Sequence, residues 1–376
     1  MNDASATVTG DAAADDRRFM DLALTLGRRG LGNTWPNPAV GAVIVKDGVI
    51  VGRGWTQAGG RPHAETEALR RAKKAANGAT MYVTLEPCSH QGKTPPCADA
   101  IVKAGLARVV SALEDPNPDV AGGGHKKLAE AGLRVDVGVR AEEARQAHAG
   151  HMARVCEQRP HVTLKLAISA DGKAGAAGRK PVAITGEVAR ARVALMRAEN
   201  DAILVGIGTV LADDPHLTCR LPGMLARSPV RVLLDARLRA PTASYVLATI
   251  RESPTWVFAG KGASPIAEEI LQEKGAQVFR VSGHDGELDL TEVVKILAEQ
   301  GITRLMVEGG PTVAASFLQA DLVDEAMLFR SPKNIGPDGV AALEGMPLDA
   351  LTASKKLRWL AGEQLADDTL EHFGRA

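Results

Sequence analysis

The sequence is poor in aromatic residues, which make up 3% of its 376 residues, and it contains four cysteines. Neither charge is in excess, because 45 lysines and arginines balance 45 aspartates and glutamates. A chain without net positive charge lacks the field that collects nucleic acid or anionic membranes, and few aromatic rings are available to stack on bases. We therefore expect neither nucleic acid nor a membrane as its partner.

Long hydrophobic runs are also missing. No stretch of 18 or more apolar residues occurs, so no membrane span is predicted. The start of the chain, MNDASATVTGDAAADD, is acidic and lacks the basic and apolar regions of a secretory signal, so residues 1–14 are predicted to be a flexible tail. Four cysteines in a chain of this length do not form a disulfide framework. These features predict a cytoplasmic protein with reduced thiols.

Strand and helix patterns alternate in a first block. A helix capped by Asp15 or Asp16 is followed by a hairpin, AVGAVIVKDGVIVGRG, around Asp47-Gly48. A second helix begins at His63, and three strand patterns, ATMYVTL, ARVVSAL and LRVDVGV, then alternate with short helices. The segment AEEARQAHAGHMARVCEQRP is predicted to close the block as one helix.

A second block of the same kind follows Pro160. Its predicted strands are VTLKLAIS, DAILVGI, VRVLLDA, TWVFAG, AQVFRVS, TRLMVEGG and DEAMLFRSP, and its predicted helices are at 186–199, 264–274, 290–300 and 311–319. Alternation of this kind predicts α/β sheets covered by helices. We expect two unlike α/β domains, residues 15–155 and 160–376, joined near residues 151–160.

The first block carries a set of metal-binding residue types. His63, Cys88 and Cys97 supply the three protein ligands that a catalytic zinc ion usually has, with a fourth position left for water. Glu65 lies near the same helix start and could exchange a proton with that water, whose pKa zinc lowers to roughly 7. The sequence therefore predicts a Zn²⁺ site with Glu65 as its acid and base. A closed structural site with His90 as a fourth ligand is the alternative.

The motif HAE followed by PC and a further cysteine is similar to the zinc nucleobase and nucleotide deaminases. Eight residues separate the two cysteines here, and the loop EPCSHQGKTPPC with the upstream PNPAVGAVIV resembles the deaminase half of the bifunctional riboflavin-biosynthesis deaminase/reductase. The resemblance covers about residues 15–150. It implies a cytidine-deaminase-like α/β/α domain that removes ammonia from a phosphorylated pyrimidine, a diaminopyrimidinone carrying a ribosylamino 5'-phosphate.

The same resemblance implies the residues that contact this small-molecule substrate. Asn37 and Glu65 would hold the pyrimidine, and His90, Lys93 and Thr94 would lie near it, with Lys93 suited to the phosphate. From loop composition alone, Lys93 could equally be a solvated charge. Thr56 stands where the family usually has a histidine, so that contact differs here.

In the second block, LMVEGGPTVAASFL reads as a strand, two glycines and a helix whose N-terminus could bind a phosphate, although a tight turn would explain the glycines almost as well. Together with LKLAISADGKAG, ITGEVAR and GIGTVLADDPHLTCR, it resembles the reductase half of the same bifunctional enzyme. That resemblance implies a dihydrofolate-reductase-like domain that uses NADPH. The implied chemistry is hydride transfer to C1' of the ribosyl group, which opens the sugar.

The resemblance also implies the reductase site. Substrate would contact Pro181, Arg197, Leu217, Arg220 and Glu308, and the two arginines suit a phosphate. The cofactor would contact Ala167, Ala183, Thr209, Asp213, Ala236, Gly310, Pro311, Thr312, Val313, Ala314, Ala315 and Ser316. Lys165 and Glu308 are candidates for proton handling, and a purely structural ion pair is the rival interpretation.

Two positions depart from the family, which often has a serine at Pro181 and an aromatic residue at Ala183. NADPH rather than NADH follows from the resemblance, with Arg237 and Arg239 as possible partners of the 2'-phosphate. We also expect a homo-oligomer.

The sequence disfavours other interpretations. A nucleic-acid deaminase, such as a tRNA adenosine deaminase with an appended domain, is disfavoured by the zero net charge and few aromatic residues. A non-catalytic zinc protein would have no use for Glu65. His148, His151 and Cys156 lack a partner that would complete a second metal site, so an exposed helix face is predicted there, and Gly122–Gly124 are predicted to be a flexible loop.

Overall fold

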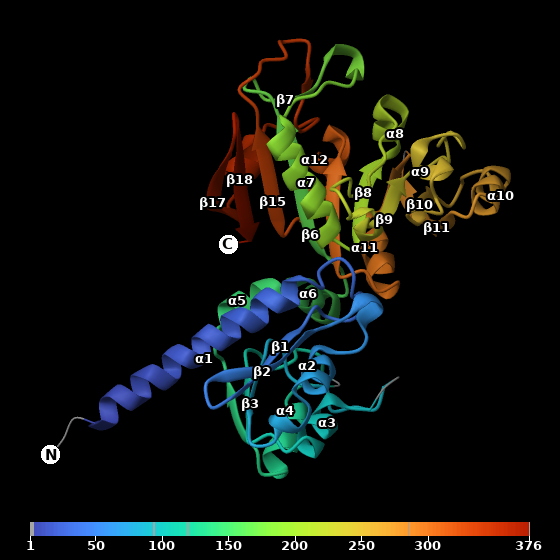
Figure 1. The fold of residues 1–376 in the computed structure, drawn as a ribbon. Helices are drawn as coiled ribbons and strands as arrows, with labels where there is room; N and C mark the ends of the chain where they lie inside the picture. Colours follow the sequence, from blue (N-terminus) through green and yellow to red (C-terminus); the bar gives the residue numbers. More distant parts are fainter. Residues whose placement is uncertain (1–3, 93–94, 119, 285, 376) are drawn as a thin grey trace. The chain divides into compact units, whose positions relative to one another are not determined.

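The computed structural model describes residues 4–92, 95–118, 120–284 and 286–375, with side chains described from residue 13 onward. The chain divides into two compact units, Met1–Gln158 and Arg159–Ala376. Figure 1 shows that each unit is built on its own sheet. None of the helices in the described part of the chain is long and apolar enough to cross a membrane.

The first unit contains a five-stranded sheet in the order β2-β1-β3-β4-β5. Its strands are β1 (Gly41–Lys46), β2 (Val49–Trp55), β3 (Thr80–Val83), β4 (Arg108–Ser111) and β5 (Arg134–Val137). β1 pairs antiparallel with β2 and β3, whereas β3, β4 and β5 are parallel. The predicted hairpin is confirmed: Asp47 and Gly48 both have positive φ, 51° and 76°, as a two-residue hairpin turn requires.

Six α-helices accompany this sheet in the described residues. They are α1 (Ala4–Arg28), α2 (Ala64–Ala72), α3 (Cys97–Lys103), α4 (Gly123–Glu130), α5 (Ala141–Ala147) and α6 (Ala149–Glu157). Three predictions were wrong here. Residues 4–14, predicted to be a flexible tail, belong to α1, so Asp15 and Asp16 do not cap it, and the closing helix is interrupted at His148. Asp16 instead pairs with Arg108 of β4 at 2.7 Å, which attaches α1 to the sheet.

Two glycines bring α2 close to the sheet. A Cβ atom at Gly54 of β2 would lie 2.3 Å from the carbonyl oxygen of Ala64, and one at Gly52 would lie 2.4 Å from that of Ala68. Only glycine permits this approach. The close packing fixes the start of α2, where His63 and Glu65 lie.

The second unit contains a nine-stranded sheet in the order β11-β10-β9-β8-β14-β6-β15-β18-β17. The strands are β6 (His161–Ile168), β8 (Ala202–Gly206), β9 (Val230–Leu234), β10 (Thr255–Gly260), β11 (Gln277–Val281), β14 (Arg304–Gly309), β15 (Glu325–Arg330), β17 (Leu357–Leu365) and β18 (Asp368–Arg375). Neighbours from β11 to β15 are parallel, and β17 and β18 add an antiparallel hairpin. All seven predicted strands are confirmed. Two small ladders, β7 (Lys173–Gly175) with β16 (Val340–Ala341) and β12 (Gly283–His284) with β13 (Glu287–Leu288), complete the strands described.

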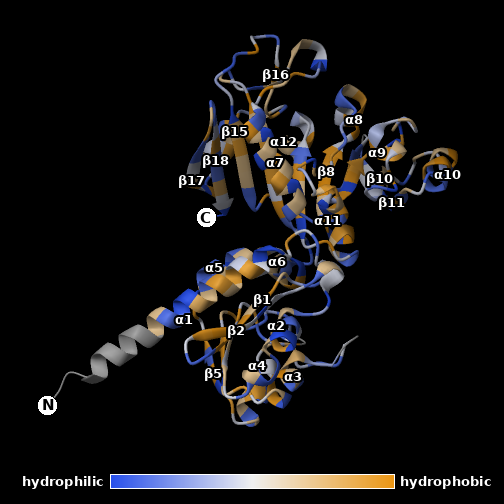
Figure 2. Cartoon of the chain, viewed as in Figure 1, coloured by the Kyte–Doolittle hydropathy of each residue, from blue (hydrophilic) through white to orange (hydrophobic). Residues whose placement is uncertain are grey.

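The α-helices described in the second unit are α7 (Glu187–Glu199), α8 (Ile207–Asp213), α9 (Tyr245–Ala248), α10 (Pro265–Glu273), α11 (Leu290–Glu299), α12 (Pro311–Gln319) and α13 (Asp349–Thr352). Four of them, α7, α10, α11 and α12, were predicted. Figure 2 shows helices that carry both hydrophobic and hydrophilic residues, as expected where one face packs on a sheet. The folds predicted from the sequence, a cytidine-deaminase-like unit and a dihydrofolate-reductase-like unit, agree with this architecture.

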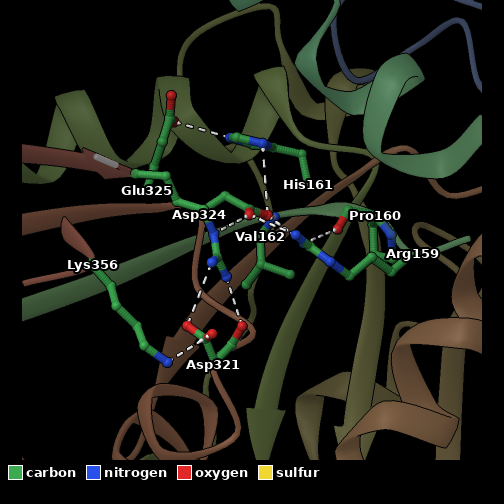
Figure 3. A network of polar contacts seen from close by, with 9 residues as sticks. Arg159, Pro160, His161, Val162, Asp321, Asp324, Glu325 and Lys356 are labelled. Carbon is green, nitrogen blue, oxygen red and sulfur yellow. Dashed lines mark hydrogen bonds and ion pairs between the residues drawn. The ribbon is translucent and has the colours of Figure 1, made fainter. Parts of the chain in front are cut away.

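A buried ionic network holds the beginning of the second unit to its last strand (Figure 3). Asp324, which is 6% exposed, accepts two hydrogen bonds from Arg159, at 2.5 and 2.8 Å, and one from Nε of Arg375 at 2.9 Å. His161 lies between Asp324 and Glu325, at 3.7 and 3.5 Å. Burial opposes ionisation of Asp324, but Arg159 holds the pKa of its carboxyl below the ordinary value.

Candidate active sites

Three predicted metal ligands meet in the first unit. His63 precedes α2, Cys88 lies in the loop after β3, and Cys97 begins α3. Nδ1 of His63 lies 3.7 Å from Sγ of Cys88 and 3.3 Å from Sγ of Cys97, and all the ligand atoms lie within 4.8 Å of one another. The fold therefore brings together one imidazole and two thiols that are far apart in the sequence.

The chemistry of this donor set fits zinc. Hydrogen bonding from Cys97, whose backbone N–H lies 3.3 Å from Sγ of Cys88, lowers the pKa of the Cys88 thiol to about 4. The thiolate is the form that binds a metal. Three ligands leave one position open for water, and the exposed His90 is not among the converging residues in the described part of the chain. The geometry favours an open site over a closed structural one.

Glu65 lies in the first turn of α2, two residues after His63, and is 4% exposed. Burial raises the pKa of its carboxyl, and the neighbouring His63 opposes that effect. A carboxyl that binds a proton more readily than usual, next to an open metal position, suits an acid and base.

Glu86 fixes the loop that carries Cys88, a role that the sequence reading missed. Its buried carboxylate accepts four backbone N–H groups, from Asp115, Gly122, Gly124 and His125, at 2.7 to 3.1 Å. The ligand atoms of Glu86, Glu114 and His125 also lie close together, but four hydrogen bonds occupy the carboxylate that a metal would need. Glu86 is therefore an anchor between two loops.

The glycines after this loop are not a flexible segment, contrary to the prediction. A Cβ atom at Gly124 would lie 1.9 Å from the carbonyl oxygen of Pro87, and Gly122 has φ 73°. These residues are needed so that the backbone can approach Pro87 and Glu86 closely. The run of three glycines was a signal in the sequence that could have indicated this close approach of the backbone to Glu86.

The predicted substrate contacts of the first unit are placed only in part. Asn37 donates from Nδ2 to the carbonyl oxygen of Gly60 at 2.8 Å, which places it beside the segment leading to His63. Lys93 and Thr94 lie outside the described residues. Thr56 is 2% exposed, and its hydroxyl accepts the N–H of Val40 at 3.0 Å. Its side chain therefore connects the residue before β1 to the residue after β2 and does not face a ligand.

His148 and His151 are buried, contrary to the prediction of an exposed helix face, whereas Cys156 is exposed. Nε2 of His148 lies 3.0 Å from Oγ1 of Thr84, and Nε2 of His151 lies 3.0 Å from Oδ1 of Asp115. These contacts hold α5 and α6 against the loops that follow β3 and β4.

The second unit contains a cavity of about 1510 Å³ at the carboxyl ends of its parallel strands. Most of the predicted reductase residues line it, namely Lys165, Ala167, Pro181, Ala183, Arg197, Thr209, Asp213, Leu217, Arg220, Ala236, Glu308, Gly310, Pro311, Thr312, Val313 and Ser316. Ala314 and Ala315 do not line it; they are 0% and 3% exposed because this side of α12 packs into the core. The cofactor contacts of these two residues stay a prediction, and their backbone would have to make them.

A buried charge cluster lies in this cavity. Nζ of Lys165 lies 3.5 Å from Oε1 of Glu308, and Arg197 holds the same carboxylate through two hydrogen bonds of 2.7 and 2.9 Å. Burial lowers the pKa of Lys165, and it also opposes ionisation of Glu308, but Arg197 and Lys165 hold the pKa of Glu308 below the ordinary value. The cluster pairs a carboxylate whose charged form is favoured with a lysine that binds its proton less tightly than usual.

The role of Arg197 as a phosphate clamp stays a prediction, because three of its five N–H groups already donate within the protein. Its Nε and Nη2 donate to Glu308, and its Nη1 donates to the carbonyl oxygen of Thr218 at 3.1 Å. Arg220 is exposed and lines the cavity, and its contact with the substrate phosphate stays a prediction.

Backbone groups at one side of the cavity form a cradle. Gly309 ends β14 and Gly310 precedes α12, both with positive φ, and the N–H of Gly310 donates to Oγ1 of Thr209 at 3.2 Å. The N-terminus of α12, begun by Pro311, faces the same space. Free N–H groups at a helix start are suited to the phosphates of a dinucleotide.

One residue beside the cradle was not predicted. Glu344 binds both Oγ1 of Thr312 and the guanidinium of Arg179, and so connects the segment after β7 to the start of α12. The sequence carries no motif that marks this contact.

Two family models match the chain. The cytidine and deoxycytidylate deaminase zinc-binding region matches residues 13–113, and the RibD C-terminal domain matches residues 160–370. The zinc ligands and the reductase cavity lie within these two ranges.

Curated relatives cover nearly the whole chain. The riboflavin biosynthesis protein RibD of Aquifex aeolicus (strain VF5) is 42% identical over 360 residues, which are 96% of this chain and 98% of that protein. RibD of Escherichia coli (strain K12) is 42% identical and covers 88% of this chain and 92% of its own length.

Solved structures agree with these matches. Acinetobacter baumannii RibD, form 1, is 35% identical with a TM-score of 0.86, and the likeness covers 97% of this chain and 99% of that one. A Thermotoga maritima diaminohydroxyphosphoribosylaminopyrimidine deaminase/5-amino-6-(5-phosphoribosylamino)uracil reductase is 34% identical with a TM-score of 0.84, over 97% of this chain and 100% of that one. This chain therefore belongs to the RibD family of riboflavin biosynthesis proteins.

Proposed function

We propose that this chain catalyses two consecutive steps of riboflavin biosynthesis. The first is the zinc-dependent deamination of 2,5-diamino-6-(5-phosphoribosylamino)pyrimidin-4-one, and the second is the NADPH-dependent reduction of the ribosyl group to ribityl, which gives 5-amino-6-(5-phosphoribitylamino)uracil. The observation that carries the proposal is the presence of both sites on one chain that matches RibD relatives over nearly their full length. A nucleic-acid deaminase is not favoured, because the family match includes the reductase unit.

In the deamination, His63, Cys88 and Cys97 would hold zinc, which when bound lowers the pKa of a water molecule. Glu65 would accept a proton from the attacking water and deliver it to the departing nitrogen. The ring carbon then exchanges its C–N bond for a C–O bond, ammonia leaves, and a carbonyl remains. The burial of Glu65 supports this role, because it keeps the carboxyl in an environment where it binds a proton readily.

In the reduction, NADPH supplies the hydride for C1' of the sugar. Lys165 would give a proton to the ring oxygen as the C1'–O bond breaks, and Glu308 would hold Lys165 in place. The lowered pKa of Lys165 supports this assignment. Arg220, Pro181 and Leu217 would contact the substrate from the cavity wall.

The experiment supplies the diaminopyrimidinone phosphate to zinc-loaded protein and measures ammonia and NADPH absorbance separately. Both signals should change, and NADPH should be consumed after ammonia appears. Ammonia release without NADPH oxidation would support only the first step. A sample that neither releases ammonia nor oxidises NADPH would reject the proposal.

We further infer a homo-oligomer formed through β17. This edge strand of the large sheet exposes residues on both faces, including Trp359 at 61% and Leu360 at 42%, an arrangement that invites pairing with another strand. Antiparallel pairing with a second copy can place Arg358 opposite Glu363. Sedimentation of the wild type and of a Leu360→Lys variant tests this, because the variant should be monomeric; an unchanged mass would reject it.

We place the protein in the cytoplasm. All four cysteines are free thiols in the structure, and two of them are proposed metal ligands, which fits a reducing compartment. Fractionation of the source cells is the direct test.

A further inference from the structure

Two loops border the reductase cavity and are joined to each other. β6 and β15 are parallel neighbours, so the loops that follow them, residues 169–183 and 331–344, begin side by side (Figure 1). The carboxylate of Asp171 in the first loop accepts the N–H groups of Ile335 and Gly336 in the second, at 3.0 and 2.7 Å. β7 of the first loop also pairs with β16 of the second. These contacts hold the two loops together as one unit, which we call the flap.

Glu344, the last residue of the flap, attaches it to the start of α12. The Glu344 carboxylate accepts a hydrogen bond from Oγ1 of Thr312 in the first turn of α12, and it pairs with the guanidinium of Arg179 in the first loop. The backbone N–H of Glu344 donates to the carbonyl oxygen of Pro311 at 3.3 Å. Hydrogen bonding from Thr312 lowers the pKa of the Glu344 carboxyl, so this side chain is an anion at neutral pH.

The partners of Glu344 belong to the cradle at the side of the cavity. Glu344 is not among the residues that line the cavity, whereas Thr312 and Arg179 both line it, next to Gly310. Gly310 has no side chain that could cap α12, and the free N–H groups and dipole at a helix start attract an anion. A hydroxyl and a guanidinium are also groups that bind phosphate. Glu344 therefore holds, from outside the cavity, two groups that a phosphate inside it would use.

We propose that Glu344 competes with the pyrophosphate of the cofactor for Thr312 and Arg179, and thereby limits how tightly the reductase site binds NADPH. The inference rests on the proposed reductase function. The side chains of Arg179 and Glu344 are 58% and 41% exposed, and an exposed ion pair is weak enough for a doubly charged ligand to exchange. A cofactor that has taken over both groups leaves the Glu344 carboxylate near a second anion, and the repulsion between the two weakens binding.

The test measures cofactor binding to the full chain without turnover. Calorimetry compares wild type with Glu344→Gln, which keeps the size of the side chain and an oxygen acceptor for Thr312 but removes the charge. NADPH should bind about fivefold more tightly to the variant, because the competing anion is gone. Adenosine 2'-monophosphate, which has no phosphate at its 5' end, should bind both proteins equally.

Arg179 tests the exchange from the other side. Arg179→Gln should weaken NADPH by about fivefold, because the pyrophosphate loses a cation and Glu344 loses the partner that neutralises it. In the double variant with Glu344→Gln the two effects should nearly cancel. Glu299→Gln, at an exposed carboxylate outside the cavity, removes the same charge as Glu344→Gln and should leave NADPH binding unchanged.

A tie that only stabilises the flap would have the opposite sign, because its loss would loosen the cavity wall and weaken NADPH. Weaker or unchanged NADPH binding by Glu344→Gln would therefore overturn the inference. Equal tightening by Glu299→Gln, or a gain that persists in full in the double variant, would overturn it too. Glu344→Ala should also tighten NADPH and provides a second variant. Wild-type protein that binds no NADPH would instead reject the reductase function itself.

Discussion

Arg197 binds both carboxylate oxygens of Glu308, from Nε to Oε2 at 2.9 Å and from Nη2 to Oε1 at 2.7 Å. Lys165 adds a second cation 3.5 Å from the same carboxylate. A single carboxylate thus faces two buried cations, and the bidentate pair with Arg197 leaves Lys165 as the more loosely held partner. This inequality is what makes Lys165 a candidate proton donor.

Replacement of Glu308 by glutamine tests that cluster. Glu308→Gln should reduce NADPH oxidation by about 10²-fold or more, because Lys165 loses its positioning partner, and should leave ammonia release unchanged. Removal of one buried partner should also lower the free energy of unfolding by about 3 to 5 kcal/mol. Chemical denaturation and both assays measure this, with the exposed Glu299→Gln as control; unchanged NADPH oxidation would contradict the role.

Glu65→Gln separates metal binding from proton transfer in the first unit. The variant should retain zinc, because Glu65 is not among the converging ligands, and ammonia release should fall by about 10²- to 10⁴-fold. Glu67→Gln alters a carboxylate of the same helix that pairs with Arg70 and should keep the activity. Undiminished ammonia release from Glu65→Gln is the result that would sink the assignment.

Metal content tests the ligand set. Cys88→Ala and Cys97→Ala should each lose bound zinc and ammonia release, whereas the exposed Cys156→Ala should keep both. A chelator should act on the wild type in the same way and leave NADPH oxidation of the deaminated substrate intact. Elemental analysis that finds full zinc in the Cys88 and Cys97 variants would contradict the site.

The Glu86 anchor makes a prediction about folding. Glu86→Gln replaces an oxygen acceptor by an N–H₂ group, so two of its four backbone donors lose their partner. Each unsatisfied buried group costs about 1 to 3 kcal/mol, and the loop with Cys88 should loosen. The melting temperature and the amount of zinc retained should both fall. Glu114→Gln, at an exposed neighbour, should be close to wild type in both measurements.

Acid stability should depend on the network around Asp324. The pKa of Asp324 is lowered in the folded state, and His161 helps to lower that of Glu325 to about 2 against the effect of burial. A lowered folded pKa gives stability that is present above the unfolded value, about 4, and is lost as pH falls through the folded one. Wild-type stability should therefore decline between about pH 4 and pH 2.

Asp324→Asn should remove part of that decline. At neutral pH the substitution should lower the free energy of unfolding by about 3 to 5 kcal/mol, because Arg159 and Arg375 lose a buried partner. Below pH 4 the stability of the variant should vary less with pH than that of the wild type. Asp321→Asn, whose ion pair with Lys356 is exposed, should have a small effect. Equal acid sensitivity in wild type and Asp324→Asn would show that the network does not govern the decline.

Periodicity and turn residues predicted most of the fold, because the parallel strands of the second unit are nearly continuous apolar runs. β17 was missed because seven consecutive exposed residues, from Arg358 to Gln364, give neither alternation nor an apolar run. The extension of α1 was missed because small and acidic residues before Asp15 resemble a tail in composition. In both places the local sequence pattern does not indicate the strand or helix that forms there.

The zinc ligands were predictable because histidine and cysteine at this spacing have few other uses. Contacts between residues that are far apart in the sequence and meet only in the folded chain were not predictable. Glu86 reaches backbone groups 29 to 39 residues away, and nothing in the local sequence reveals that its carboxylate points at them. The pairing of Arg197 with Glu308, 111 residues away, was likewise not visible in the sequence.

The most direct test follows one sample of zinc-loaded chain supplied with the diaminopyrimidinone phosphate and NADPH. One equivalent of ammonia should appear for each equivalent of NADPH oxidised, and Glu65→Gln should stop both signals while still oxidising NADPH when given the deaminated intermediate. NADPH oxidation without any ammonia from the wild type, or full activity in both assays after complete removal of zinc, would contradict the assignment of two linked reactions to this chain.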